Sequence, residues 1–157
     1  MQKITPFLWF DGNAEEAVNF YTSIFKDGKV NRVSRYGDAG PGPKGSVMTA
    51  SFQILGQEFI ALNGGPQFKF TPAISFLVNC ETQQEVDELW DKLSDGGEKQ
   101  PCGWLKDKYS LSWQIVPSIL GRLMSDPNPA KAKNVMTAML QMKKLDIQAL
   151  QKAYDAA

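Results

Sequence analysis

The chain has 157 residues, and its 17 Lys and Arg side chains balance 17 Asp and Glu side chains, so its formal net charge is zero. Hydrophobic residues make up 43% and charged residues 22%, which is typical of a globular chain and excludes wholesale disorder. The sequence contains no histidine, which excludes imidazole-dependent catalysis and any His-ligated metal site, and the balanced charge argues against a nucleic-acid partner.

The N-terminal segment predicts a strand followed by a helix. Residues Ile4–Phe10 form a short, apolar and aromatic run that is typical of a buried strand. Asn13 is a residue type suited to cap a helix, and apolar residues then recur at helical spacing from Ala17 to Phe25. We therefore expect an amphipathic helix that ends near Asp27.

Three further strands are expected before the middle of the chain. They are Lys29–Tyr36, Ser46–Leu55 and Glu58–Leu62, and Gly56 lies in a tight hairpin between the last two. The loop Gly37–Gly45 holds four glycines and two prolines. Such a loop either simply connects two strands or gates a ligand site at the mouth of the sheet.

The second half of the chain repeats this order of elements. Residues Ala73–Val78 predict a buried strand, and Thr82 or Asn79 could cap the amphipathic helix that follows. Two strand candidates come next, Lys99–Leu105 and Tyr109–Val116. We interpret the pattern as an internal repeat of a strand, a helix and then strands.

The last part of the chain predicts helices. Pro117 stops the final strand, and the break at Asp126–Pro129 separates it from two helices, Ala130–Met142 and Ile147–Tyr154. Both helices are too short to be stable alone, so their apolar faces are expected to bury against the sheet or against a second subunit.

The sequence therefore predicts an α+β fold with two β-α-β-β-β modules and a helical extension. The expected segments are 1–66 for the first module, 67–128 for the second module and 129–157 for the C-terminal extension.

Cys80 and Cys102 are too few for a disulfide framework, and the N-terminus does not resemble a secretion signal. No apolar run approaches the roughly 20 residues that a membrane span requires. We expect a cytoplasmic protein with reduced thiols and no membrane partner.

Several stretches resemble one known group of proteins. They are Thr5–Phe25, Leu62–Pro66 (LNGGP), Phe68–Glu88, Pro101–Pro117 (PCGWLKDKYSLSWQIVP) and Met136–Tyr154. This pattern resembles the PhnB-like group of the glyoxalase/bleomycin-resistance (vicinal oxygen chelate) superfamily, also labelled 3-demethylubiquinone-9 3-methyltransferase-like. The resemblance implies two modules whose mixed sheets curve around a cleft, and a homodimer as the common assembly.

Enzymes of this superfamily typically hold a divalent metal with His and Glu side chains. Carried onto this chain, the metal positions fall near Thr5, Ala73, Ala61 and Gln114, none of which is His, Asp or Glu. The nearest carboxylate, Glu58, is expected to be an exposed hairpin residue. We therefore predict no metal and no cofactor.

The methyltransferase label also lacks support in the sequence. A nucleotide-type cofactor is usually cradled by a glycine-rich turn that leads into a helix. The glycines at 64 and 65 are followed by Pro66 and an aromatic segment instead.

An aromatic cleft remains as the predicted site. Because alternate residues of a strand face one side, Thr5, Phe7 and Trp9 should share a face. If Gln114 also lines the cleft, Trp113 packs behind the sheet under the helix. The candidate ligand-binding residues are Thr5, Phe7, Trp9, Asn63, Trp104 and Gln114. The alternative is that the aromatic side chains only fill the core.

The leading hypothesis is a metal-independent protein that binds a small aromatic or quinone-like molecule. A first alternative is an enzyme of the superfamily, a lyase or transferase, that uses non-metal groups such as the thiol of Cys102, although Cys102 could equally be structural. A second alternative is a dimeric interaction protein that uses its methionine-rich C-terminal helices.

Overall fold

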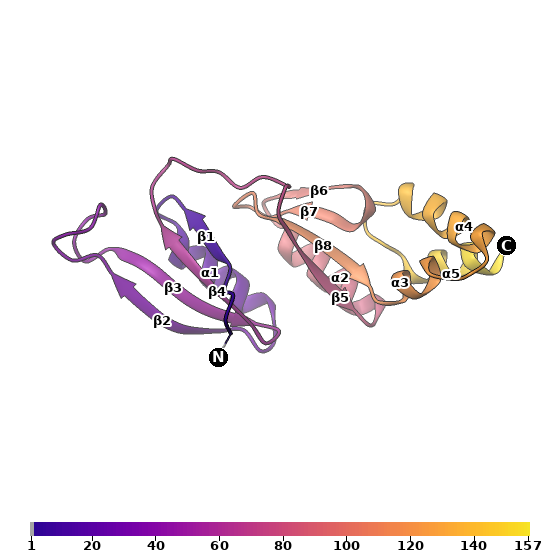
Figure 1. Cartoon of the computed structure of the whole chain (residues 1–157), viewed down its shortest axis with the longest axis horizontal. Coiled ribbons are helices and arrows are strands. Elements are labelled where there is room, and N and C mark those ends of the chain that lie inside the picture. The colour runs from indigo at the N-terminus through magenta and orange to yellow at the C-terminus, as the bar shows by residue number, and fades with distance from the viewer. Residues whose placement is uncertain (1) are drawn as a thin grey trace. The chain divides into compact units, whose positions relative to one another are not determined.

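The computed structural model describes residues 2–157 and has an α+β architecture with two four-stranded mixed sheets (Figure 1). The chain divides into two compact units, of which the first ends at Phe70 and the second begins at Thr71. The division falls inside the segment 63–71 that links the two repeats in the sequence.

Unit 1 contains one helix and one sheet. Its elements are β1 (Phe7–Phe10), α1 (Ala14–Ile24), β2 (Lys29–Arg35), β3 (Val47–Ile54) and β4 (Gln57–Asn63). The strand order is β1-β4-β3-β2, with β1 parallel to β4 and the other pairs antiparallel. The parallel pair requires a crossover, and α1 and the strands after it supply that crossover.

Helix α1 covers one face of the unit 1 sheet, and the core lies between them. On β1, Leu8 and Phe10 point toward this covered face and are buried. Tyr21 of α1 stacks on Phe52, and Phe52 stacks on Phe59, with ring centroids 5.9 and 5.3 Å apart. The opposite side of the sheet has no covering helix within unit 1, and we call it the open face of unit 1.

Unit 2 begins with the same topology. Its first elements are β5 (Ser75–Cys80), α2 (Gln83–Ser94), β6 (Glu98–Lys99), the short 3-10 turn η1 (Pro101–Gly103), β7 (Trp104–Lys106) and β8 (Ser112–Pro117). The strand order β5-β8-β7-β6, with β5 parallel to β8, reproduces that of unit 1. The predicted repeat and fold class are confirmed.

All three strands predicted in unit 2 have different bounds in the structure, and β5 runs over Ser75–Cys80 where Ala73–Val78 was expected. The expected strand Lys99–Leu105 is two short strands, because Pro101 starts the turn η1 between them. The expected strand Tyr109–Val116 begins only at Ser112, because the residues before it form a tight turn around Asp107.

The two sheet-covering helices begin differently. Thr82 caps α2 as predicted, since its hydroxyl accepts a hydrogen bond from the Glu85 amide. Asn13 occupies the N-cap position of α1 but its side chain makes no capping bond, so the predicted role of Asn13 is wrong. Instead, the side-chain oxygen of Asn63 accepts from the Ala14 amide at 2.9 Å.

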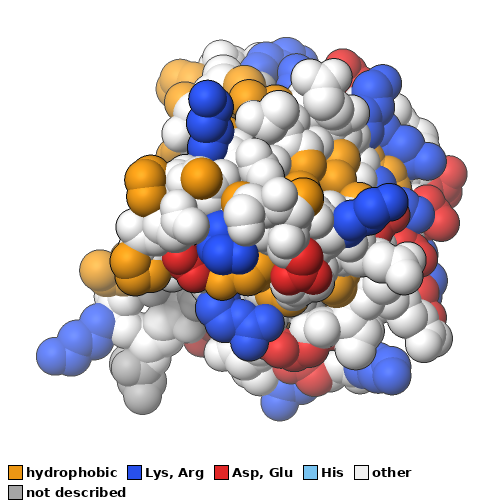
Figure 2. All heavy atoms as spheres, turned by 90° about the vertical axis from the view of Figure 1, so that its right-hand side faces the viewer, with side chains coloured by type: hydrophobic (Ala, Val, Ile, Leu, Met, Phe, Trp, Pro, Cys, Tyr) orange, Lys and Arg blue, Asp and Glu red, His pale blue; other side chains and the backbone are white. Residues whose placement is uncertain are grey.

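Three helices follow β8 in unit 2: α3 (Ile119–Met124), and then α4 (Pro129–Leu140) and α5 (Ile147–Asp155), which form the C-terminal extension. They pack on one another around Leu123, Val135, Leu145 and Leu150, and Val116 of β8 joins the edge of this cluster. The expectation that the sheet or a second subunit buries these helices was therefore incomplete. Figure 2 views the side on which α4 and α5 lie in Figure 1, and charged side chains of both signs are mixed there with apolar ones.

No helix within residues 2–157 is long and apolar enough to cross a membrane. Both cysteines have free thiols. Burial, together with the nearby carboxylates of Glu85 and Glu81, raises the pKa of the Cys80 thiol to about 12, so Cys80 stays protonated at neutral pH.

Candidate functional site

The open face of unit 1 carries an aromatic pair. Phe7 and Trp9 alternate with buried residues on β1, and the register places them beside Ile60 and Leu62 of β4. Phe7 is 60% exposed and Trp9 is half-buried. The sequence-predicted residues Phe7 and Trp9 therefore do share one face.

The segment after β4 holds the Trp9 ring in place. The indole N–H of Trp9 donates to the Gly65 carbonyl at 2.9 Å, and Phe68 meets the ring edge-on with centroids 4.8 Å apart. A side chain at Gly64 would overlap the indole ring, so only glycine allows this close approach. The LNGGP motif is thus explained by packing against Trp9.

Thr5 lies just before β1, and Glu58 is the only carboxylate that the described residues of β1 and β4 contribute. Glu58 alternates with Ile60 on β4 and so shares the open face. The side-chain amide nitrogen of Gln2 contacts both the Thr5 hydroxyl, at 3.4 Å, and the Glu58 carbonyl, at 3.0 Å. Thr5 and the Glu58 backbone thus share Gln2 as a partner, whereas Ala61 is buried under α1.

Asn63 lies on the covered side of the unit 1 sheet, because its register partner is the buried Phe10. Its side-chain oxygen accepts from the Ala14 amide and its side-chain nitrogen donates to the Val47 carbonyl at 3.1 Å. These bonds join the start of α1 to the start of β3 and the end of β4. The structure thus places Asn63 on the opposite side of the sheet from Phe7 and Trp9, where its bonds are structural.

Unit 2 has an open face of its own. Trp104 of β7 and Gln114 of β8 are direct cross-strand partners, and Leu77 of β5 is the register partner of Gln114 on its other side. The side-chain nitrogen of Gln114 donates to the Ser75 hydroxyl at 2.9 Å. Trp104 and Gln114 therefore lie together, and Leu77, which is 49% exposed, extends the apolar surface.

The other side of β8 is fixed by the buried carboxylate of Asp107. Asp107 accepts hydrogen bonds from the Tyr109 and Leu111 amides and, at 2.9 Å, from the Trp113 indole nitrogen. Trp113 is 2% exposed, so it packs behind the sheet as its alternation with Gln114 predicts. Asp107 thereby holds the turn and the first part of β8.

Cys102 lies in η1, two residues before Trp104. It is half-buried, and its thiol points toward the Met139 carbonyl at 3.8 Å. Its backbone has a φ of 62°, a left-handed conformation that is uncommon for residues other than glycine.

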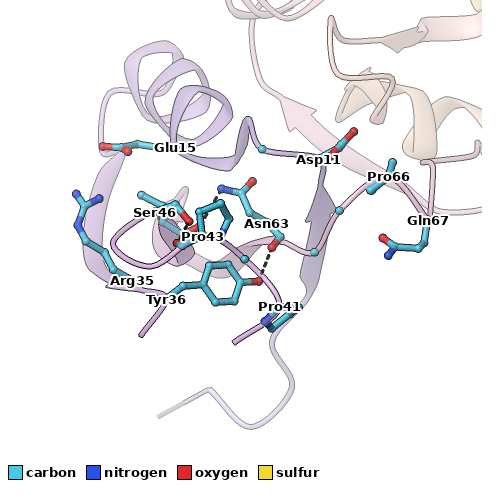
Figure 3. Close-up of a pocket in the computed structure, with 15 residues that line it drawn as sticks. Asp11, Glu15, Arg35, Tyr36, Pro41, Pro43, Ser46, Asn63, Pro66 and Gln67 are labelled. Atoms are coloured by element: carbon cyan, nitrogen blue, oxygen red, sulfur yellow. Dashed lines mark hydrogen bonds between the residues drawn. The ribbon is translucent and has the colours of Figure 1, made fainter. Parts of the chain in front are cut away.

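Unit 1 also contains a hollow of about 640 Å³ near the start of α1 (Figure 3). The loop 37–45 forms one wall, and side chains at Gly40 and Gly42 would overlap the ring of Tyr36, so this loop packs directly on Tyr36. The Tyr36 hydroxyl donates to the Asn63 carbonyl at 2.6 Å. Asp11, Glu15 and Arg35 are the charged side chains around the hollow.

The donors on the open faces do not fit the metal that the superfamily resemblance implies. In unit 1, Glu58 is the single carboxylate on β1 and β4, and in unit 2 the open-face side chains of β5 and β8 are hydroxyl, amide and apolar groups. Within residues 2–157, no group of three or more His, Cys, Asp and Glu side chains is placed to hold a metal ion. A divalent cation bound by one carboxylate and neutral groups gains too little to offset its dehydration.

Solved structures define the class of the fold. A genomically encoded fosfomycin resistance protein, FosX, from Listeria monocytogenes, complexed with Mn(II) and sulfate, superimposes with a TM-score of 0.53 at 16% identity, covering 78% of this chain and 97% of that chain. The two four-stranded mixed sheets with their helices thus share the fold of that protein.

Within that class, the chain belongs to the family described as 3-demethylubiquinone-9 3-methyltransferase, which it matches over residues 2–116. A putative 3-demethylubiquinone-9 3-methyltransferase, a PhnB protein from Bacillus cereus, is 43% identical, with a TM-score of 0.66 and coverage of 74% of this chain and 100% of that chain. Protein PA1353 from Pseudomonas aeruginosa is 22% identical, with a TM-score of 0.62 and coverage of 74% and 98%. A search of curated proteins gave no significant match.

Proposed function

We propose that this protein binds a planar aromatic or quinone-like small molecule on the open faces of its sheets, without a metal ion. The observation that carries the proposal is the composition of those faces. They expose aromatic rings, aliphatic side chains and neutral amides, and they offer no set of donors for a cation.

The chemistry of the faces suits a flat ligand. Trp104 and Trp9 offer half-buried rings for stacking, and Phe7 and Leu77 are apolar side chains that remain largely exposed. Covering such surface is favourable by about 25 cal/mol per Å². The Gln114 amide, anchored by Ser75, can exchange hydrogen bonds with a ring carbonyl or hydroxyl and so orient the ligand.

The family description names a quinone-derived substrate and a methyl transfer, and only the ligand class enters our proposal. A methyl donor of nucleotide type is usually held by a glycine-rich turn that leads into a helix. Gly64 and Gly65 instead pack on Trp9 and lead through Pro66 into an extended segment. The chemistry of the open faces therefore favours binding over methyl transfer.

Fluorescence titration with tetramethyl-1,4-benzoquinone tests the proposal. This probe is planar, quenches tryptophan emission and has no free ring position for addition of a cysteine thiol. We expect saturable quenching and a higher melting temperature, because a ligand that binds only the native state stabilises it. Trp104→Phe should weaken the quenching, whereas Trp90→Phe, which alters a buried ring on α2, should not.

Gln114 provides the second arm of the test. Gln114→Ala should raise the dissociation constant about fivefold, the value of one hydrogen bond, and Gln84→Ala on the exposed side of α2 is the matched control. Unchanged binding in both Trp104→Phe and Gln114→Ala would contradict the proposal. Tight binding of one divalent ion per chain, measured by elemental analysis, would contradict metal independence.

The homodimer and the cytoplasmic location remain predictions. Light scattering of the purified chain measures its mass in solution, and the mass of a monomer would contradict the predicted homodimer.

A further inference from the structure

The C-terminal extension contacts the part of unit 2 that carries Trp104. The family match ends at residue 116, within β8, so α3, α4 and α5 lie outside it. Residues 142–147 connect α4 to α5, and we call this segment the strap. The strap runs against two elements of unit 2, the turn η1 and the first turn of α2.

Two consecutive backbone bonds tie the strap to η1. The Cys102 amide donates to the Met142 carbonyl and the Gly103 amide donates to the Lys143 carbonyl, both at 2.8 Å. These bonds satisfy two neighbouring amides of a turn whose own geometry leaves them unpaired.

The strap is also tied to α2. The side-chain nitrogen of Gln83 donates to the Leu145 carbonyl at 3.1 Å, and its side-chain oxygen accepts from the Ile147 amide at 2.8 Å. The side-chain amide of Gln83 thus forms hydrogen bonds with two backbone groups of the strap. Lys144 adds a partly exposed ion pair with Asp87, with the two atoms 2.9 Å apart.

The contact between the strap and η1 is close. A Cβ atom at Gly103 would lie 3.0 Å from a Leu145 side-chain carbon and 2.9 Å from the Ile115 carbonyl oxygen, and Gly103 has a φ of +82°. Leu145 is fully buried. With Cys102 also in the left-handed region, the turn is in a conformation that needs outside support.

Trp104 follows this turn directly. Its amide donates to the Pro101 carbonyl across η1, and its carbonyl accepts from the Gln100 amide at 2.9 Å. A change in η1 therefore moves the backbone of Trp104 and, with it, the ring that faces the same side as Gln114.

We propose that the strap is a positioning element for the ligand site, which holds η1 and thereby sets the orientation of Trp104 and the affinity for the planar ligand. This inference rests on the proposed function. A preorganised ring loses less conformational freedom on binding than one that must be ordered by the ligand. In this chain, the extension would supply that preorganisation from outside the residues that the family model matches.

The test compares Gln83→Ala with Gln84→Ala. Both remove a glutamine amide from the start of α2, but Gln84 bonds only to Glu88 within the helix, according to the contacts of the described residues. Hydrogen exchange of residues 100–106 measures how firmly η1 is held without any ligand, and residues 57–63 of β4 serve as the internal reference. Titration with tetramethyl-1,4-benzoquinone measures the affinity.

We expect Gln83→Ala to speed exchange in 100–106 but not in 57–63, and to raise the dissociation constant by about threefold to tenfold. Gln84→Ala should change neither. Adding Cys102→Gly to Gln83→Ala should recover part of the lost affinity, because glycine takes the left-handed conformation without cost.

The outcomes separate the two proposals. Faster exchange with unchanged affinity for the quinone would overturn the positioning role and leave the proposed function intact. Unchanged exchange would overturn the claim that the strap holds η1. If the unaltered chain does not bind the quinone at all, the proposed function fails and the inference that depends on it falls with it, whatever the exchange shows.

Discussion

The two units share one topology. They differ in how far apart along the chain the bonding partners lie that stabilise each unit from within. In unit 1, the start of α1 is capped by Asn63, 49 residues away from Ala14. In unit 2, the start of α2 is capped by Thr82, three residues from Glu85. The same structural need is met by a long-range bond in one copy and by a local bond in the other.

The hairpin turns show the same contrast. In unit 1, the carboxylate of Asp27 accepts from the Leu55 and Gly56 amides at 2.8 and 3.1 Å, across 28 and 29 residues. In unit 2, the carboxylate of Asp107 accepts from amides two and four residues ahead of it, in its own turn. Loosening a bond of unit 1 therefore separates distant segments, whereas loosening one of unit 2 first affects a single turn.

Asp107 and Asp27 differ in burial, and we expect them to differ in their contribution to stability. Asp107 is 2% exposed and also accepts from the Trp113 indole, while the bonds of Asp27 are exposed to solvent. A hydrogen bond to a charged acceptor counts for more when water cannot replace it. The local hydrogen bonds of Asp107 in unit 2 should therefore contribute more stability than the long-range hydrogen bonds of Asp27 in unit 1.

Asp107→Asn is expected to have the largest effect. The neutral amide can accept fewer of the three hydrogen bonds and places an N–H against a buried donor, so the free energy of unfolding should fall by about 3 kcal/mol. Urea denaturation followed by tryptophan fluorescence measures the change.

Asp27→Asn is the matched control in unit 1 and should cost less than about 1 kcal/mol, because its bonds are exposed. Equal losses for the two variants would show that burial does not separate the turns.

Asn63→Leu should have the next largest effect. The substitution leaves the Ala14 amide and the Val47 carbonyl without their partner, so we expect a loss of about 2 kcal/mol. Hydrogen exchange should rise at the start of α1 and at the end of β4 together. Thr82→Ala in unit 2 should cost about 1 kcal/mol and should raise exchange only in the first turn of α2. A purely local response to Asn63→Leu would contradict the contrast between the units.

Each unit also has a residue other than glycine in the left-handed region of its hairpin turn. Leu55 in unit 1 has a φ of 49° and Ser110 in unit 2 has a φ of 69°. Leu55→Gly and Ser110→Gly should each raise the free energy of unfolding by about 0.5 to 1 kcal/mol, because glycine avoids the steric cost. The alanine variants at both positions are controls and should give no gain. A gain with alanine would mean that side-chain exposure, not the backbone, limits these turns.

The contrast between the units also explains what the sequence could and could not predict. The order of elements in each repeat, the two sheet-covering helices and Thr82 as one of two candidate caps follow from residues close together in the chain, and the structure confirms them. The split of the strand at Pro101 is local too, but the short β6 and β7 have too few residues for a clear alternation.

The candidate site was also predictable only where it depends on residues close together in the chain. The shared face of Phe7 and Trp9 follows from strand alternation, and so does the burial of Trp113 behind Gln114. The pairing of Trp104 with Gln114 needs the register between two strands, which no local pattern supplies. The capping role of Asn63 was missed for the same reason, since only the tertiary fold brings it to α1.

The smallest expected effect concerns the ion pair that joins the strap to α2. Hydrogen bonds from Gln83 and then from Lys144 lower the pKa of Asp87, and the bond to Asp87 raises the pKa of Lys144. Stability from Asp87 is therefore present above the ordinary Asp pKa of about 3.9 and is lost as the pH falls through the lowered value. Stability from Lys144 is present below the ordinary Lys pKa of about 10.4 and is lost as the pH rises through the raised value.

Because the side chains of Asp87 and Lys144 are both partly exposed, the change in stability with pH should be modest. We expect the unaltered chain to exceed Asp87→Asn in urea midpoint at pH 7 and the difference to shrink between pH 4 and pH 3. Unit 1 has no comparable strap in its described residues, and its exposed pair between Lys44 and Asp38 lies within one loop. Lys44→Gln should therefore leave the urea midpoint unchanged at neutral pH. If the midpoint falls as far as it does in Asp87→Asn, an ion pair contributes equally whether or not it joins two elements.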